Sequence, residues 1–239
     1  MGIEDFWGAR LSEVLSRSPG LTATARRRVG EWAWLSREST RVPLSKARVV
    51  VVDTETSGLD VKHDTLLSIG ACVISEGTVA IAESFYHELR QKSASPESNI
   101  LVHGIGREAQ LAGEAEADAL SAFLAFAGKS PMAAFNAPFD HAFLARAMRN
   151  YLGVNFRPDW IDLYELPKAM YPADAASLKT LDEWLARFSI VHHQRHNALA
   201  DAYCTAQLLL VMMGKAELEG YKSLRALLRA QRNYQWQRR

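Results

Sequence analysis

Residues 48–56 read RVVVVDTET, and this stretch decides the fold. Four successive valines are typical of a short strand buried on both faces of a sheet, and Ser57-Gly58 marks the turn that ends it. Because side chains alternate along a strand, Asp53 and Glu55 are expected on one face, at the C-terminal edge of the sheet. Two carboxylates at the mouth of an apolar sheet are costly unless a cation or strong donors balance them. The pair therefore indicates a cation site, although a solvated strand end also fits.

The segments that follow this strand alternate in a βββαβα order. Residues 66–74 and 78–89 are expected as strands joined by a turn at Ser75-Glu76-Gly77, which gives an antiparallel meander. Beyond them the apolar spacing predicts strands at 131–136 and 160–163 and helices at 116–127, 138–151, 177–188 and 197–213. Alternation of helices and strands implies parallel strands. We therefore expect a five-stranded mixed sheet, three antiparallel strands then parallel strands, flanked by helices.

The composition favours one main domain with an extension at each end. We expect an N-terminal helical extension at 1–47 with helices at 3–17 and 22–38, a main domain at 48–213, and a basic C-terminal helical tail at 214–239.

Charge is unevenly distributed between these parts. Residues 1–48 carry nine basic and five acidic residues, residues 214–239 carry seven and two, and the stretch between them carries twelve and twenty. An acidic domain that attracts a polyanion needs bound metals or basic flanks, although solvated arginine-rich ends explain the flanks equally well.

No apolar run of membrane-spanning length and no signal-peptide pattern occurs in the sequence, so we expect no membrane association. Cys72 and Cys204 lie in apolar stretches and are expected as reduced core residues. Together these features predict a cytoplasmic protein.

Three further residues are candidates for the cation site. Asp140 lies in the first turn of a predicted helix that follows a strand, where an acid also complements the helix dipole. His196 precedes Asp201 by five residues, which on one continuous helix turns the side chains about 140° apart. We therefore expect His196 on the incoming loop and Asp201 inside the helix, with Asn197 as N-cap, so that both side chains converge. Each motif alone is weak, and their order along the chain supports a single site.

The stretches VVDTETSGL (51–59), NAPFD (136–140) and RHNALADA (195–202) resemble the three sequence blocks of the DEDDh, or DnaQ-like, 3′-to-5′ exonuclease family. NILVHGIG (99–106) is similar to the family's HGI element. The resemblance runs from about Arg48 to Met213 and implies an RNase H-like fold. The family includes the proofreading epsilon subunit of bacterial DNA polymerase III, RNase T and oligoribonuclease.

The resemblance also implies a metal-dependent hydrolase with two divalent cations, Mg²⁺ or Mn²⁺. Asp53 would bridge both ions, Glu55 and Asp201 would complete the site of the attacking water, and Asp140 would act largely through water. His196 would be the general base. The residues implied to contact the terminal nucleotide are Thr56, Ser57, Gly58, Leu59, His103 and Asn136, although Ser57-Gly58 is equally well explained as a turn.

From this resemblance we expect release of nucleoside monophosphates from the 3′ end of single-stranded DNA. An exoribonuclease of the RNase T or oligoribonuclease kind is an alternative, because the same five site residues serve DNA and RNA. A non-catalytic nucleic-acid-binding accessory module is a second alternative. Association with a DNA polymerase and the oligomeric state stay open at this point.

Overall fold

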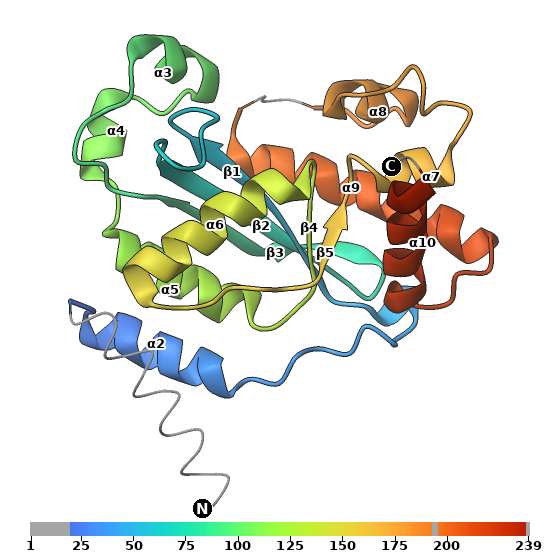
Figure 1. Cartoon of the computed structure of the whole chain (residues 1–239), viewed down its shortest axis with the longest axis horizontal. Coiled ribbons are helices and arrows are strands. Elements are labelled where there is room, and N and C mark those ends of the chain that lie inside the picture. The colour runs from blue at the N-terminus through green and yellow to red at the C-terminus, as the bar shows by residue number, and fades with distance from the viewer. Residues whose placement is uncertain (1–19, 193–195, 238–239) are drawn as a thin grey trace, which may run out of the picture.

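The computed structural model describes residues 20–192 and 196–237 as a five-stranded sheet with helices on both faces (Figure 1). The strands are β1 (Val49–Thr56), β2 (Leu66–Ser75), β3 (Thr78–Glu88), β4 (Met132–Ala134) and β5 (Trp160–Asp162). The α-helices are α2 (Ala23–Trp34), α3 (Glu97–His103), α4 (Arg107–Ala112), α5 (Glu116–Ala127), α6 (Ala137–Leu152), α7 (Leu166–Met170), α8 (Leu181–Arg187), α9 (Ala198–Leu218) and α10 (Leu224–Gln237), and a 3₁₀ turn, η1, covers Leu44–Lys46.

The sheet has the strand order β3-β2-β1-β4-β5. The pairs β1 with β2 and β2 with β3 are antiparallel, whereas β1 with β4 and β4 with β5 are parallel. Glu76 and Gly77, with φ of 51° and 72°, form the two-residue loop between β2 and β3, because Ser75 pairs with Thr78. Positive φ at both loop residues is the hairpin geometry that matches strand twist. The expected mixed sheet and its hairpin turn are confirmed.

The valines of β1 alternate between two hydrophobic cores. Val50 and Val52 belong to the core that α2, α5 and α6 cover, whereas Val49 and Val51 belong to the core that α7, α8, α9 and α10 cover. Asp53 and Glu55 continue the odd series, so they emerge on the side of α9, and Thr54 emerges on the side of α6.

The segments on either side of the expected main domain pack onto it. Helix α2 lies beside α5 (Figure 1), and its Ala25 and Val29 are fully buried in the first core. Helix α10 contributes Leu224, Leu227 and Leu228 to the second core. The helix expected at 22–38 ends at Trp34, and the one expected at 3–17 lies outside the described residues.

Several helices differ from expectation. Helices α3, α4 and α7 were not predicted, because each has seven residues or fewer and shows little apolar periodicity. Helix α8 begins at Leu181 and not at 177, because Thr180 and Glu183 form a capping box. Helix α9 continues to Leu218, past the expected end at 213. Among the described helices, none has the length and apolar character needed to cross a bilayer.

Candidate active site

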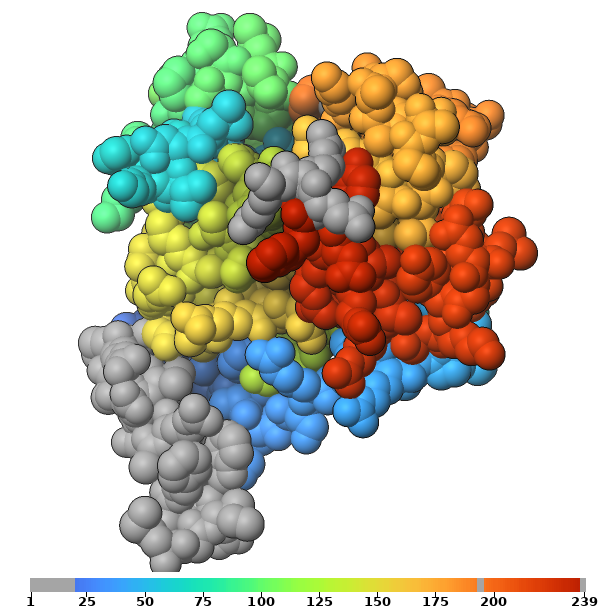
Figure 2. Space-filling view, turned by 45° about the vertical axis from the view of Figure 1, so that its right-hand side comes forward, coloured from blue at the N-terminus to red at the C-terminus, as the bar shows by residue number. Residues whose placement is uncertain are grey.

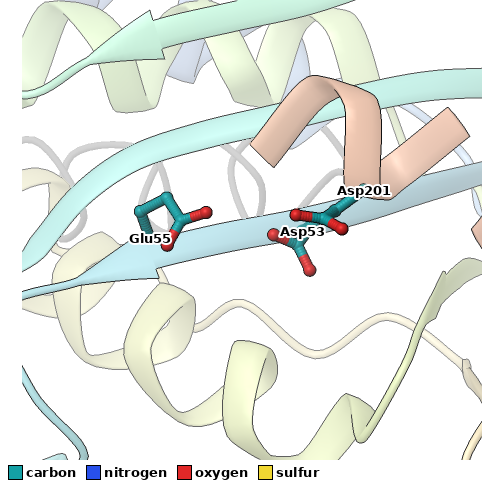
Figure 3. Close-up of side chains that lie close together, drawn as sticks. All are labelled: Asp53, Glu55 and Asp201. Atoms are coloured by element: carbon teal, nitrogen blue, oxygen red, sulfur yellow. The ribbon is translucent and has the colours of Figure 1, made fainter. Parts of the chain in front are cut away.

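Three carboxylates meet at the C-terminal end of β1. Asp53 and Glu55 come from β1 and Asp201 comes from the first turn of α9 (Figure 3). One ligand oxygen from each lies within 4.8 Å of the others. Asp201 is 5% exposed, so the group is partly withdrawn from water. Clustered carboxylate oxygens repel one another and are the donors that hard divalent cations such as Mg²⁺ and Mn²⁺ prefer. This donor set fits a divalent metal site.

A glycine in β2 lets α9 come this close. Gly70 is the register partner of Asp53. A Cβ added to Gly70 would lie 2.1 Å from the carbonyl carbon of Ala198 and 2.2 Å from the backbone nitrogen of Leu199. The first turn of α9 therefore rests directly on the β2 backbone, a contact that only glycine permits. This close approach brings Asp201 to Asp53.

The start of α9 is built as the sequence predicts. The Asn197 side chain caps the helix by accepting a hydrogen bond from the backbone N–H of Ala200 at 3.0 Å. His196 precedes the cap in a left-handed conformation with φ of 59°, and its backbone N–H donates to Oδ2 of Asp201 at 3.0 Å. The turn therefore fixes both the histidine backbone and the aspartate carboxylate.

A second histidine, which the sequence analysis missed, contacts the same carboxylate. Nε2 of His192 lies 3.1 Å from Oδ1 of Asp201, and Nδ1 lies 3.9 Å from Asp182. The His192 side chain is 8% exposed, and its two nitrogens lack hydrogen-bond geometry, so this is a close polar contact without a directed bond. Only its position nine residues before Asp201 hinted at this role.

Asp140 lies apart from the three clustered carboxylates. It occupies the first turn of α6, as expected, and is 3% exposed. Its Oδ1 accepts a hydrogen bond from Thr54 Oγ1 at 2.8 Å, on the α6 side of β1. Burial raises the pKa of the Asp140 carboxyl to about 7, and the bond from Thr54 opposes this shift.

Without metal, the free energy of unfolding is expected to fall as pH rises from about 4 to about 7, and Asp140→Asn is expected to remove this part of the pH dependence. The folded protein keeps the Asp140 proton across this window, whereas the unfolded chain releases it near 3.8, so rising pH favours unfolding. Denaturant unfolding in EDTA at several pH values measures the difference. Asp159→Asn, at an exposed aspartate before β5, is the control, and parallel profiles for wild type and Asp140→Asn would contradict the prediction.

A hollow of about 730 Å³ opens beside the carboxylates. Phe135 and Tyr164 form an aromatic wall, with ring centroids 5.9 Å apart and planes at 85°. Leu59, 85% exposed, stands at the rim, and Lys179 adds a cation there. The residues that line the hollow are Asp53, Thr54, Glu55, Leu59, Phe135, Asn136, Phe139, Tyr164, Lys179, Thr180, Leu181, His196 and Asp201.

Leu59 and Asn136 are expected from the sequence as pocket residues, and both line this hollow. Phe135, Tyr164 and Lys179 also line it and were not predicted. Phe135 directly follows β4, and Tyr164 lies two residues after the end of β5. Their position after the C-terminal ends of parallel strands, where ligands bind in such sheets, was the signal in the sequence.

Asp162 holds the wall of the hollow in shape. Its Oδ1 accepts hydrogen bonds from the backbone N–H groups of Ala137 at 3.2 Å and Tyr164 at 3.0 Å. Asn136, in a left-handed conformation, makes no capping bond to α6, so Asp162 supplies a capping acceptor from another strand. Gln231 of α10 accepts a hydrogen bond from the backbone N–H of Asp162 at 2.8 Å.

The turn after β1 is held by its own side chains. Ser57 Oγ donates to Asp64 Oδ1 at 3.0 Å and accepts from the backbone N–H of Thr65 at 2.9 Å, and Thr56 Oγ1 donates to the Gly58 carbonyl at 2.7 Å. A Cβ on Gly58 would lie 2.4 Å from a carboxylate oxygen of Asp64. The structural explanation of Ser57-Gly58 as a turn is therefore sufficient, and neither residue lines the hollow.

His103 lines a neighbouring hollow of about 380 Å³, which shares Glu55 and His196 with the first. The residue is 3% exposed, with Nδ1 accepting from the backbone N–H of Ile105 and Nε2 lying 3.1 Å from Ser95 Oγ. Burial lowers the pKa of His103. Nδ1 thus serves the α3–α4 connection and Nε2 serves the loop before α3, so His103 borders the site without offering it a polar atom.

A family model described as an exonuclease matches residues 50–209. The chain is 32% identical over 165 residues to a DNA polymerase III PolC-type protein of Thermotoga petrophila, a match that covers 69% of this chain and 12% of that protein. It is 31% identical over 188 residues to a DNA polymerase III subunit epsilon-like protein of Rhodobacter capsulatus, with 78% and 26% covered. The chain therefore spans about an eighth to a quarter of these relatives' length.

Solved structures share the architecture. Escherichia coli exonuclease I in complex with a dT13 oligonucleotide aligns with a TM-score of 0.62 at 18% identity, over 72% of this chain and 42% of that one. Exonuclease X in complex with 5′ overhanging duplex DNA aligns with a TM-score of 0.57 at 19% identity, over 75% and 99%. These likenesses confirm the expected RNase H-like fold.

Proposed function

Because the chain belongs to the exonuclease family, we propose that it hydrolyses the terminal phosphodiester bond of a nucleic-acid strand and releases nucleoside monophosphates from the 3′ end of single-stranded DNA. The observation that carries this proposal is the meeting of Asp53, Glu55 and Asp201 within 4.8 Å at the wall of the 730 Å³ hollow. Family membership supports the class of reaction, and the carboxylate cluster supports the position of the active site.

Asp53, Glu55 and Asp201 would hold two divalent cations, Mg²⁺ or Mn²⁺. When bound, such ions stabilise the negative charge that develops on the attacking and leaving oxygens. Asp140 stays in the proposed site as a fourth acid. Its support is the hydrogen bond from Thr54, the neighbour of Asp53, and a nearby positive charge would favour its ionised form.

His196 is the proposed general base, which takes a proton from the attacking water on a ring nitrogen. It lines both hollows, as Glu55 does, and its backbone is fixed by the bond to Asp201. Phe135 and Tyr164 offer the terminal base and sugar an aromatic wall, and Leu59 stands where it can pack against the last base.

His196→Ala is expected to slow hydrolysis about 10²- to 10⁴-fold while Mn²⁺ binding is largely retained, because a general base contributes to proton transfer and not to holding the ion. Single-turnover rates measure the first effect, and the rise of Tm with Mn²⁺ measures the second. His87→Ala, at a histidine outside both hollows, should leave the rate unchanged. Undiminished hydrolysis by His196→Ala would remove it as the base.

The test of the function is digestion of matched 5′-labelled single-stranded DNA and RNA oligonucleotides with Mg²⁺ or Mn²⁺. Products that shorten stepwise from the 3′ end, and that disappear in EDTA, are expected. Faster loss of DNA supports the proposed substrate, and faster loss of RNA would move the assignment to an exoribonuclease. Intact oligonucleotides in both metals would overturn the enzyme in favour of a non-catalytic binding module.

Association with a DNA polymerase is part of the proposal, because the relatives named above are polymerase III proteins. Co-purification with the polymerase of the source cell tests it, and recovery of the chain alone would contradict it. A cytoplasmic location, where thiols stay reduced, is part of the proposal and suits the buried thiols of Cys72 and Cys204. Cell fractionation tests this location, and recovery outside the cytoplasm would contradict it.

A further inference from the structure

Helix α10 has one buried and one basic face. The buried face is apolar except for Gln231, which binds the Asp162 backbone. The opposite face carries four exposed residues spaced by four, three and four positions, which places them on one side of a helix. We call this the α10 stripe, and it consists of Arg225, Arg229, Arg232 and Trp236.

The charge of the α10 stripe is not neutralised within the helix, because residues 224–237 include no acidic residue. The ion pairs between residues that the structure describes involve none of the three guanidinium groups. Trp236 is 80% exposed, although an indole gains free energy when its apolar surface is covered. Three arginines followed by an exposed indole are the side chains that bind phosphates and stack on bases.

Helix α10, which carries the stripe, packs behind one wall of the proposed active site. Gln231 binds Asp162, and Asp162 in turn binds Ala137 and Tyr164 at the wall of the hollow. The C-terminal end of α10 points toward the same edge of the molecule as the end of β5 (Figure 1). In Figure 2 the C-terminal segment, in red, lies beside the yellow-green region of α6 and below the orange region of α7 and α8.

We propose that the α10 stripe binds the single-stranded nucleic acid on the 5′ side of the 3′ end held in the active site. Arg225 and Trp236 are eleven residues apart, which corresponds to roughly 16 Å along a helix. That length matches about four or five phosphates of a strand whose bases stay stacked at roughly 3.4 Å per nucleotide, and fewer of an extended strand. The guanidinium groups neutralise phosphates, and the indole stacks on a base, without reading sequence. This inference rests on the proposed function for the direction of the strand, and on α10 alone for the binding.

The test is equilibrium binding of a fluorescein-labelled single-stranded oligonucleotide in EDTA, where no hydrolysis intervenes. R225Q/R229Q/R232Q is expected to weaken binding at least about tenfold and to reduce the slope of log affinity against log salt by about 2, at roughly 0.7 per lost phosphate contact. Trp236→Ala is expected to weaken binding at least about fivefold with an unchanged salt slope. Both variants retain the buried face, and an unchanged Tm verifies the fold.

A charge-matched control removes three scattered exposed arginines in R41Q/R149Q/R157Q. Full binding by this control, together with loss in the stripe variant, supports the proposal. Equal loss in both triple variants would show an effect of net charge and overturn it. An equal loss of polyglutamate binding in the stripe variant would assign the surface to acidic proteins instead. The binding assay needs no turnover, so the two proposals fail separately. A wild-type protein that binds the oligonucleotide but does not hydrolyse it contradicts only the proposed function. A stripe variant that binds as tightly as an active wild type contradicts only this inference.

Discussion

Replacing Asp53 with alanine is expected to lower the rate of 3′-end hydrolysis at least about a thousandfold, because the carboxylate proposed to hold both ions is lost. The protein is expected to stay folded. In EDTA its Tm should equal or exceed that of the wild type, since Asp53 lies among carboxylates that repel it. With Mn²⁺ the wild-type Tm should rise by mass action, and the Tm of the variant should not.

Asp159→Ala is the matched control for Asp53→Ala. Asp159 is exposed and directly precedes β5, at the opposite end of the parallel strands from the carboxylate cluster. The control should retain both hydrolysis and the Mn²⁺-dependent rise in Tm. An Asp53→Ala protein that is unfolded in EDTA would contradict the stability argument, and one that hydrolyses normally would contradict the metal assignment.

Gly70→Ala is expected to lower hydrolysis about a hundredfold or more and to weaken Mn²⁺ binding, although Gly70 touches neither ion nor substrate. The added Cβ would meet backbone atoms of Ala198 and Leu199 at 2.1 and 2.2 Å, and backbone cannot yield as a flexible side chain does. The start of α9 must therefore move away from β2 and take Asp201 with it. A displacement of about 1 Å at a reacting centre costs on the order of 10²-fold in rate.

Gly214→Ala is the control, because it makes the same substitution within α9, where an added Cβ meets nothing within 4 Å. It should leave hydrolysis unchanged and raise stability by up to about 1 kcal/mol, since alanine is the better helix former. Rates on a labelled oligonucleotide and Mn²⁺-dependent Tm shifts measure both variants. Full activity in Gly70→Ala would show that Asp201 does not depend on this close approach.

The sequence predicts those parts of the site that depend on local geometry. The alternation along β1 places Asp53 and Glu55 together, and the Asn197 cap places Asp201 in the first turn of α9; the structure confirms both. The close approach at Gly70 has only a weak local signal, a glycine within a strand pattern. That Gly70 makes room for the first turn of α9 follows only from the contact between β2 and α9 in the folded protein.

The face of the sheet on which Asp140 meets β1 could not be predicted from local sequence. Thr54 and Asp53 are neighbours in the chain but face different cores, and α6 covers the Thr54 side. Which face a helix covers between two parallel strands depends on the handedness of the crossover and on strand order. The wall formed by Phe135 and Tyr164 was missed for a different reason, because β4 and β5 are three residues long and their ends meet only in the folded sheet.

The hydrogen bond from the Asp162 backbone to Gln231 bears on whether the nuclease unit can fold without α10. Residues 50–209 match the family. Leu224, Leu227 and Leu228 of α10 lie outside this range, yet they belong to the second hydrophobic core. Gln231 accepts the hydrogen bond of the buried Asp162 N–H near the wall of the hollow. A fragment cut at the borders of sequence similarity would expose those apolar contacts to water and leave that N–H without its acceptor. A chimaera that takes the nuclease unit therefore needs its last helix, α10, as well.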